Sequence, residues 1–200
     1  LAPQVANMIA AGEVVERPAS VVKELLENAL DAGADAVTVE IRQGGITYIR
    51  VTDNGGGMEP EDAVVAFLRH ATSKIKGERD LESIHTLGFR GEALAAIASV
   101  SRVDLFTKTR SAPLGLHLAL TGGEITEQEE TGCPDGTTIV IKDLFFNTPA
   151  RMKFLKKDST EASYVEQAAE QVALAHPGLT LKFIKDGKEG LYTPGDGNMM

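Results

Sequence analysis

The spacing of apolar positions changes along the chain, which predicts helices and strands in alternation. Between residues 18 and 32 apolar residues recur every three or four positions, as on one face of a helix. Pro18 stands where it can begin this helix, and Gly33 is placed to end it. A shorter helix is predicted before it at residues 5–11, and another after it at residues 60–70.

A strand with one solvent-exposed face is predicted next, because Val37, Val39 and Ile41 alternate with polar residues. Residues 43–45 form a hairpin turn, and residues 46–53 return as a second strand. Further strands are expected at residues 102–107, 114–120, 124–129, 137–142 and 179–185, and helices at 92–99 and 159–176. This order favours a two-layer α/β sandwich, with helices on one face of a mixed sheet.

Composition and charge narrow the class of protein. The 200 residues include 20 Lys and Arg against 29 Asp and Glu, a formal net charge of −9. This balance disfavours a dedicated nucleic-acid or anionic-membrane binder, because such surfaces normally show a basic excess. A single Cys133 leaves no intrachain disulfide and no Cys-based zinc site. No apolar run approaches the ~18 residues of a membrane span, so we expect one soluble, cytoplasmic domain.

Polar residues border the apolar face of the helix predicted at residues 18–32. Glu24 and Asn28 are four positions apart and lie on one line at the rim of the core, which Asp31 extends. A carboxylate and a carboxamide so placed could serve a water molecule and a hard cation such as Mg²⁺. The alternative, a solvated helix flank, stays open from this helix alone.

The strand at residues 46–53 ends in a carboxylate followed by a glycine run. Asp53 belongs to the side that Ile49 and Val51 bury, so it needs a hydrogen-bond donor. The run at residues 54–57 has almost no side chains to block a flat ligand, and adenine could donate its amino group to Asp53. The alternative is a tight turn with Asp53 satisfied by backbone amides. Pro60 breaks the dinucleotide glycine pattern, and no P-loop motif occurs.

Two segments flank a polar connection, at residues 71–75 and 87–93. The second leads directly into an apolar helix, where backbone amides form a ready anion site to which Lys74 or Arg90 could add charge. Such a glycine-bounded loop can act as a lid, although an ordinary surface loop is the alternative. Thr137 begins a β-branched strand, and its hydroxyl could join Asp53 beneath a base.

Taken in order, these pieces resemble the N-terminal ATPase domain of the MutL family of DNA mismatch-repair proteins, which has the GHKL or Bergerat ATP-binding fold. The pattern E-x-x-x-N, D-x-G-x-G, glycine lid and G-T is shared with gyrase-type, Hsp90-type and histidine-kinase ATPases. Residues 9–20, 88–94 and 146–151 look particular to MutL. The resemblance covers nearly the whole chain, residues 1–200, and implies a mixed, mostly antiparallel sheet.

The resemblance implies a role for each matching residue. Glu24 matches the general base that activates water, Asn28 the Mg²⁺ ligand and Asp53 the acceptor of the adenine amino group. Further nucleotide contacts are implied at Gly55, Gly57, Met58, Thr72, Ser73, Lys74, Leu87, Gly88, Phe89, Arg90, Gly91 and Thr137.

The resemblance also implies ATP and Mg²⁺ as cofactors, with ATP binding driving dimerisation and coordinating MutS and other repair proteins. In the family a ribosomal-S5-like domain and a C-terminal dimerisation domain follow, so we expect this chain to be a fragment. We expect it to be a monomer with weak turnover, and the full-length protein to be a homodimer that meets DNA. The alternatives are a nucleotide-sensing module with little hydrolysis, another GHKL ATPase, or a DNA-binding module built on the basic residues Arg151, Lys153, Lys156 and Lys157.

Overall fold

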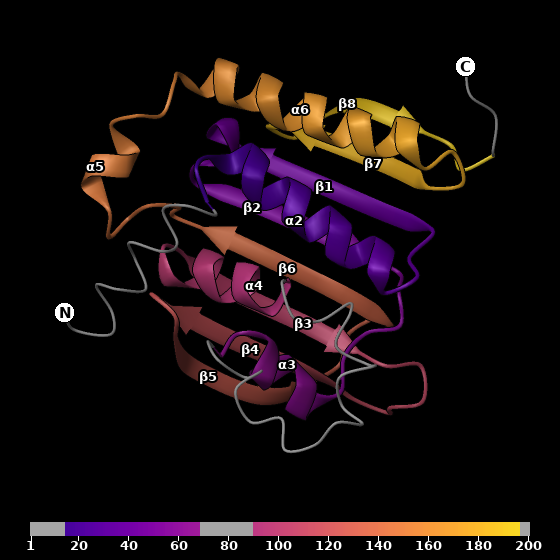
Figure 1. Ribbon diagram of the computed structural model, residues 1–200. Helices are drawn as coiled ribbons and strands as arrows, with labels where there is room; N and C mark the ends of the chain where they lie inside the picture. The colour runs from indigo at the N-terminus through magenta and orange to yellow at the C-terminus, as the bar shows by residue number, and fades with distance from the viewer. Residues whose placement is uncertain (1–14, 69–89, 197–200) are drawn as a thin grey trace, which may run out of the picture.

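The computed structural model of the protein describes residues 15–68 and 90–196, and a single eight-stranded sheet organises the fold of these residues (Figure 1). The strands are β1 (Ala36–Arg42), β2 (Tyr48–Asp53), β3 (Arg102–Lys108), β4 (Gly115–Thr121), β5 (Glu124–Thr131), β6 (Gly136–Lys142), β7 (Thr180–Lys185) and β8 (Lys188–Thr193). Their order is β5-β4-β3-β6-β2-β1-β7-β8. Among these strands only the β1–β7 pair is parallel, so the mixed, mostly antiparallel sheet is confirmed.

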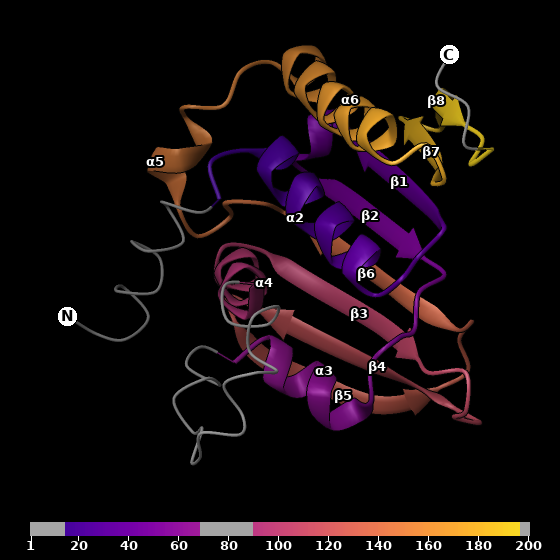
Figure 2. The ribbon, with the colours of Figure 1, turned by 45° about the vertical axis from the view of Figure 1, so that its right-hand side comes forward.

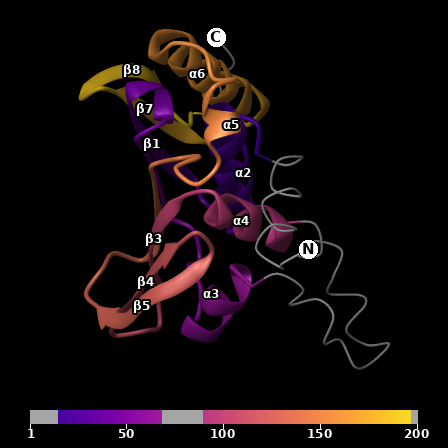
Figure 3. The same ribbon diagram turned by 90° about the vertical axis from the view of Figure 1, so that its left-hand side faces the viewer.

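Helices cover one face of this sheet. They are α2 (Pro18–Asp31), α3 (Pro60–Ala66), α4 (Arg90–Ser99) and α6 (Asp158–Ala175). The short helix α5 (Pro149–Met152) lies beyond the end of the strands (Figure 1), and a 3-10 turn η1 (Gln43–Gly45) joins β1 to β2. The views in Figures 2 and 3 show α2, α3, α4 and α6 on the same side of the strands. The predicted two-layer sandwich is therefore confirmed. None of the described helices is long and apolar enough to cross a membrane.

The helix α2 forms where the helical spacing predicts it. Pro18 occupies the first turn, and the inward face is buried at Val21, Val22, Leu25, Leu26 and Ala29. Each such side chain contributes roughly 1.5–3 kcal/mol when buried, Ala less. The helix ends in a turn in which the Ala34 N–H donates to the Ala29 carbonyl at 3.1 Å, with Gly33 at φ +76°.

The opposite face of the sheet is polar and carries paired charges. Arg50 donates to Glu40 at 2.6 Å across β1 and β2. On β4, His117 lies between Asp104 at 2.8 Å and Glu129 at 3.1 Å. On β1, Glu40 lies between the buried Val39 and Ile41, and this alternation is the pattern that predicted the strand.

The structure differs from the predicted elements at several places. The helix expected at residues 60–70 ends at Ala66, because Phe67 N–H donates to the Val64 carbonyl in a tighter turn. The helix expected from residue 92 begins at Arg90. Both α5 and β8 lack a predicted counterpart. The helix expected at residues 5–11 lies outside the described residues.

Candidate functional site

Asp53 ends β2 near the centre of the sheet, where β2 lies between β1 and β6. Its Oδ1 accepts the Gly55 N–H at 2.8 Å, and the Thr137 backbone N–H also donates to the carboxylate. Burial raises the pKa of Asp53, and these two hydrogen bonds offset only part of that increase. Backbone amides, the alternative to a ligand as partners of Asp53, are thus present. A carboxylate offers about four acceptor positions, so Asp53 can take a further donor.

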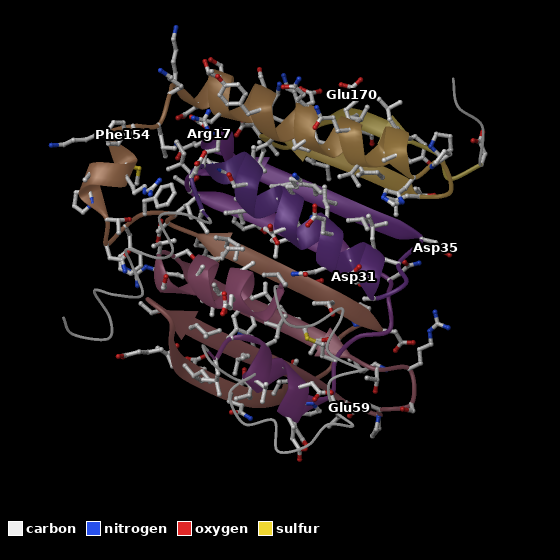
Figure 4. All side chains as sticks on the ribbon, viewed as in Figure 1. Arg17, Asp31, Asp35, Glu59, Phe154 and Glu170 are labelled. Atoms are coloured by element: carbon white, nitrogen blue, oxygen red, sulfur yellow. The ribbon has the colours of Figure 1, made fainter. Side chains whose placement is uncertain are left out.

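The glycine strip, residues 54–57, is tied to the elements around it. Asn54 Oδ1 accepts the backbone N–H groups of Asp35 at 3.1 Å and Ala36 at 3.0 Å. Gly56 N–H donates to the carbonyl of Ala32, at the end of α2, at 2.9 Å. The strip is therefore held against the start of β1 and the end of α2. Figure 4 shows this end of the molecule, with Asp31, Asp35 and Glu59 labelled.

Two glycines are required here by the backbone itself. Gly57 has φ +70°, and a Cβ on it would collide with the carbonyl of Lys108 on β3. Gly136 has φ +103°, and a Cβ there would collide with the Asp53 carbonyl. Any other residue would be strained at either position. Gly57 was predicted to let a ligand approach, and its contact with β3 is a second reason for glycine at this position.

Sequence reasoning missed one polar residue of this site, Thr107 on β3. Its side chain is 1% exposed, and its Oγ1 accepts the Met58 N–H at 2.9 Å. The same oxygen lies 3.0 Å from Thr137 Oγ1 and 3.2 Å from the Gly136 carbonyl oxygen. The available signal was the alternation of β3, which turns Val103, Leu105 and Thr107 inward and so places a hydroxyl on an apolar face.

A cavity of about 100 Å³ lies beside the end of the strip. Met58 and Thr107 line it together with Leu114 and Leu116 of the β3–β4 hairpin region. The structure thus brings Asp53, Gly55, Gly57, Met58 and Thr137 together, as the sequence predicted. Their roles toward a ligand stay predictions.

Glu24 and Asn28 lie on α2, half-buried as expected for the rim of the core. The amide nitrogen of Asn28 is buried and has no hydrogen-bond partner among the described residues. An unpaired buried amide is costly, so this position favours a ligand or ion that completes it. Rotation of the amide would present its oxygen instead, and oxygen is the atom that Mg²⁺ prefers. The residue therefore fits the predicted cation site.

The remaining predicted contacts fall largely outside the described residues. These are Thr72, Ser73, Lys74, Leu87, Gly88 and Phe89. Arg90 and Gly91 form the first residues of α4, and their side chains are not described. The predicted basic patch surrounds Phe154, which lies at the opposite end of the molecule from Asp31 and Asp35 (Figure 4). The patch is therefore separate from the site around Asp53.

Comparison with known families agrees with this fold. Residues 16–143 match the family described as histidine kinase-, DNA gyrase B-, and HSP90-like ATPase. The match covers more than half of the chain and includes α2, the strip and β6. The chain belongs to this family.

Individual relatives narrow the comparison. The chain is 56% identical to the DNA mismatch repair protein MutL of Caldanaerobacter subterraneus, over 96% of this chain and 33% of that protein. It is 54% identical to MutL of Agathobacter rectalis, over 96% of this chain and 30% of that protein. The chain thus spans about a third of the length of these curated relatives. The resemblance to the MutL ATPase domain is confirmed.

Solved structures give the same result. An Aquifex aeolicus MutL ATPase domain complexed with ADP superposes with a TM-score of 0.75 at 35% identity, over 92% of this chain and 65% of that one. The ATPase domain of Thermus thermophilus gyrase B, in complex with an aminocoumarin, superposes with a TM-score of 0.61 at 22% identity. The superposition covers 88% of this chain and 46% of the gyrase chain. At that identity the gyrase comparison supports the fold alone.

Proposed function

We propose that this chain binds ATP together with Mg²⁺ and hydrolyses it, as the ATPase domain of a MutL mismatch-repair protein. The observation that carries the proposal is Asp53, a half-buried carboxylate fixed by two backbone amides with acceptor positions to spare. A flat base with an exocyclic amino group supplies the missing donor. The solved relative with ADP supports this choice of ligand.

The axis of α2 gives the direction in which the nucleotide would lie. Ala32 packs on the glycine strip, Asn28 is one turn earlier and Glu24 one turn earlier again. At 1.5 Å per residue these steps are about 6 Å each. Base, Mg²⁺-bound phosphates and attacking water would therefore follow one another along the helix.

The chemistry is in-line attack of water on the terminal phosphate. Glu24 would orient this water and accept its proton, which is typically worth ~10²–10⁴ in rate. Asn28 would hold Mg²⁺, which when bound neutralises phosphate charge. The backbone amides at the start of α4 would favour the anionic phosphates.

We extend the proposal to the whole protein, supported by relatives about three times as long. Residues 1–200 would act as one ATPase domain, with ATP binding driving dimerisation of a cytoplasmic protein. The dimer would coordinate MutS, downstream repair proteins and DNA. The domains for these partners would lie outside this chain.

The role of Glu24 is tested by phosphate release from Mg-ATP. We predict that Glu24→Ala binds ATP as the wild type does but releases phosphate ~10²–10⁴ times more slowly, because the base is missing. Glu27→Ala is the matched control, since it removes the same charge from the same helix without the proposed role. Unchanged turnover in Glu24→Ala would contradict the role of Glu24 as general base. If the wild-type protein binds ATP but releases no phosphate, the nucleotide-sensing alternative is favoured.

A further inference from the structure

We infer that Thr107 is a positioning residue, which sets the hydrogen-bonding role of the Thr137 hydroxyl and thereby the preference of the site for adenine over guanine. The inference rests on the proposed function. Thr107 is 1% exposed and lies opposite Thr137 in the β3–β6 register, so it acts through its neighbours rather than on the base.

The neighbours of Thr107 Oγ1 limit the directions in which its one proton can point. One lone pair accepts the Met58 N–H at 2.9 Å. The proton then goes either to the Gly136 carbonyl at 3.2 Å or to Thr137 Oγ1 at 3.0 Å. A hydroxyl has one donor and two acceptor positions, so these partners use nearly all of its capacity.

Each arrangement gives Thr137 a different character. When Thr107 donates to the Gly136 carbonyl, Thr137 must spend its own proton on Thr107 and can only accept from a ligand. When Thr107 donates to Thr137, the proton of Thr137 is free for a ligand. The direction in which Thr107 donates therefore decides whether Thr137 accepts or donates, and the Gly136 carbonyl accepts the Thr107 hydrogen bond in the first case.

The arrangement in which Thr107 donates to Thr137, the shorter of its two contacts, is the one that suits adenine. Adenine presents an amino donor next to a ring-nitrogen acceptor, while guanine presents a carbonyl acceptor next to an N–H donor. Asp53 is an acceptor and suits the amino group of adenine. A Thr137 that donates completes the match, whereas guanine would oppose both groups. Sites with fixed buried polar groups discriminate strongly, because a wrong ligand leaves them unpaired.

Thr107 also fixes the end of the glycine strip. The Met58 N–H that it accepts follows Gly57 directly, and Met58 lines the cavity beside the strip. Removing the hydroxyl would leave this amide without its partner and free the rotation of Thr137. The expected effect is on binding rather than on the chemical step, because Glu24 lies on another element.

The test measures the affinities of Mg-ATP and Mg-GTP for purified variants by calorimetry. Thr107→Val keeps the shape of the side chain and removes the hydroxyl. We expect about tenfold weaker ATP binding and a smaller ATP-to-GTP ratio, with KM raised and kcat little changed. Thr107→Ser keeps the hydroxyl and should restore both affinity and ratio.

The matched control is Thr138→Val, next along β6. Its hydroxyl donates to Thr52 Oγ1 at 3.1 Å, a threonine pair on the polar face of the same sheet. Loss of that pair should leave the ATP-to-GTP ratio unchanged. Thermal unfolding of all variants separates loss of fold from loss of binding.

If Thr107→Val does not fold, Thr137→Val replaces it in the test. This substitution removes the same hydrogen bond between Thr107 and Thr137 by deleting the Thr137 hydroxyl. An ATP-to-GTP ratio unchanged in either folded variant would overturn the inference, as would an equal loss in Thr138→Val. In the Thr137→Val background, Thr107→Val should lower the ratio no further. Failure of wild-type protein to bind ATP would instead refute the proposed function.

Discussion

At the scale of single residues, the site depends on polar groups whose partners are backbone atoms. Asp53 is held by two amides, and Asn54 joins the strip to β1. Glu24 and Asn28 could be predicted because their positions follow from the local period of one helix. The alternation of β3 turns Thr107 inward, but its partners Met58 and Thr137 are 49 and 30 positions away, so no local pattern shows its role.

The pKa of Asp53 gives a prediction at this scale. Burial raises it above the ordinary 3.8, so the folded state holds the proton more tightly than the unfolded chain does. This group therefore stabilises the fold below its ordinary pKa, and the contribution is lost as pH rises through the raised value. A carbon NMR titration of the Asp53 carboxyl should give a midpoint above 3.8 without nucleotide. A midpoint at or below 3.8 would contradict this environment.

Bound ATP should lower the same pKa, because a donor favours the ionised carboxylate. The titration repeated with saturating Mg-ATP should therefore shift toward lower pH. No shift would mean that the base does not reach Asp53.

At the scale of elements, alternation and helical spacing predicted α2, β1 and β2 to within about two residues. The strand β8 was not predicted because it lies at the edge of the sheet and its residues do not alternate between apolar and polar. None of its residues is fully buried. Its signal was the turn before it, where Asp186 and Gly187 have φ +48° and +80°. An Asp-Gly pair in a two-residue loop is a strong hairpin signal.

The junction of α2 and α6 gives a second prediction. Glu161 is fully buried at the start of α6, and its Oε1 accepts the Lys156 N–H at 2.8 Å and lies 3.9 Å from Arg17, just before α2. We expect Glu161→Ala to lower the free energy of unfolding by about 2 kcal/mol, because that amide loses its partner.

Urea unfolding measures this change, with Glu170→Ala as the control. Glu170 lies exposed on the same helix (Figure 4), and its loss should change stability by no more than about 0.5 kcal/mol. Equal effects of the two substitutions would show that the buried carboxylate does not hold the junction.

At the scale of the whole molecule, the site is built from three neighbouring strands in the middle of the sheet. Asp53 is on β2, Thr137 on β6 and Thr107 on β3, and β6 joins the other two in the sheet. The sequence predicts each strand but not that β6 lies between β2 and β3. The net charge of −9 disfavoured a nucleic-acid binder, yet it allows one nucleotide to be held by backbone amides and Mg²⁺.

The central claim is that Asp53 reads the amino group of adenine, and calorimetric titration with Mg-ATP tests it most directly. Wild-type protein should bind ATP and ADP and prefer ATP to GTP. Asp53→Asn should lose this binding while keeping its fold, because an amide cannot accept as a carboxylate does and can present a donor to the amino group. Equal ATP affinity in the wild type and in a folded Asp53→Asn protein would contradict the account.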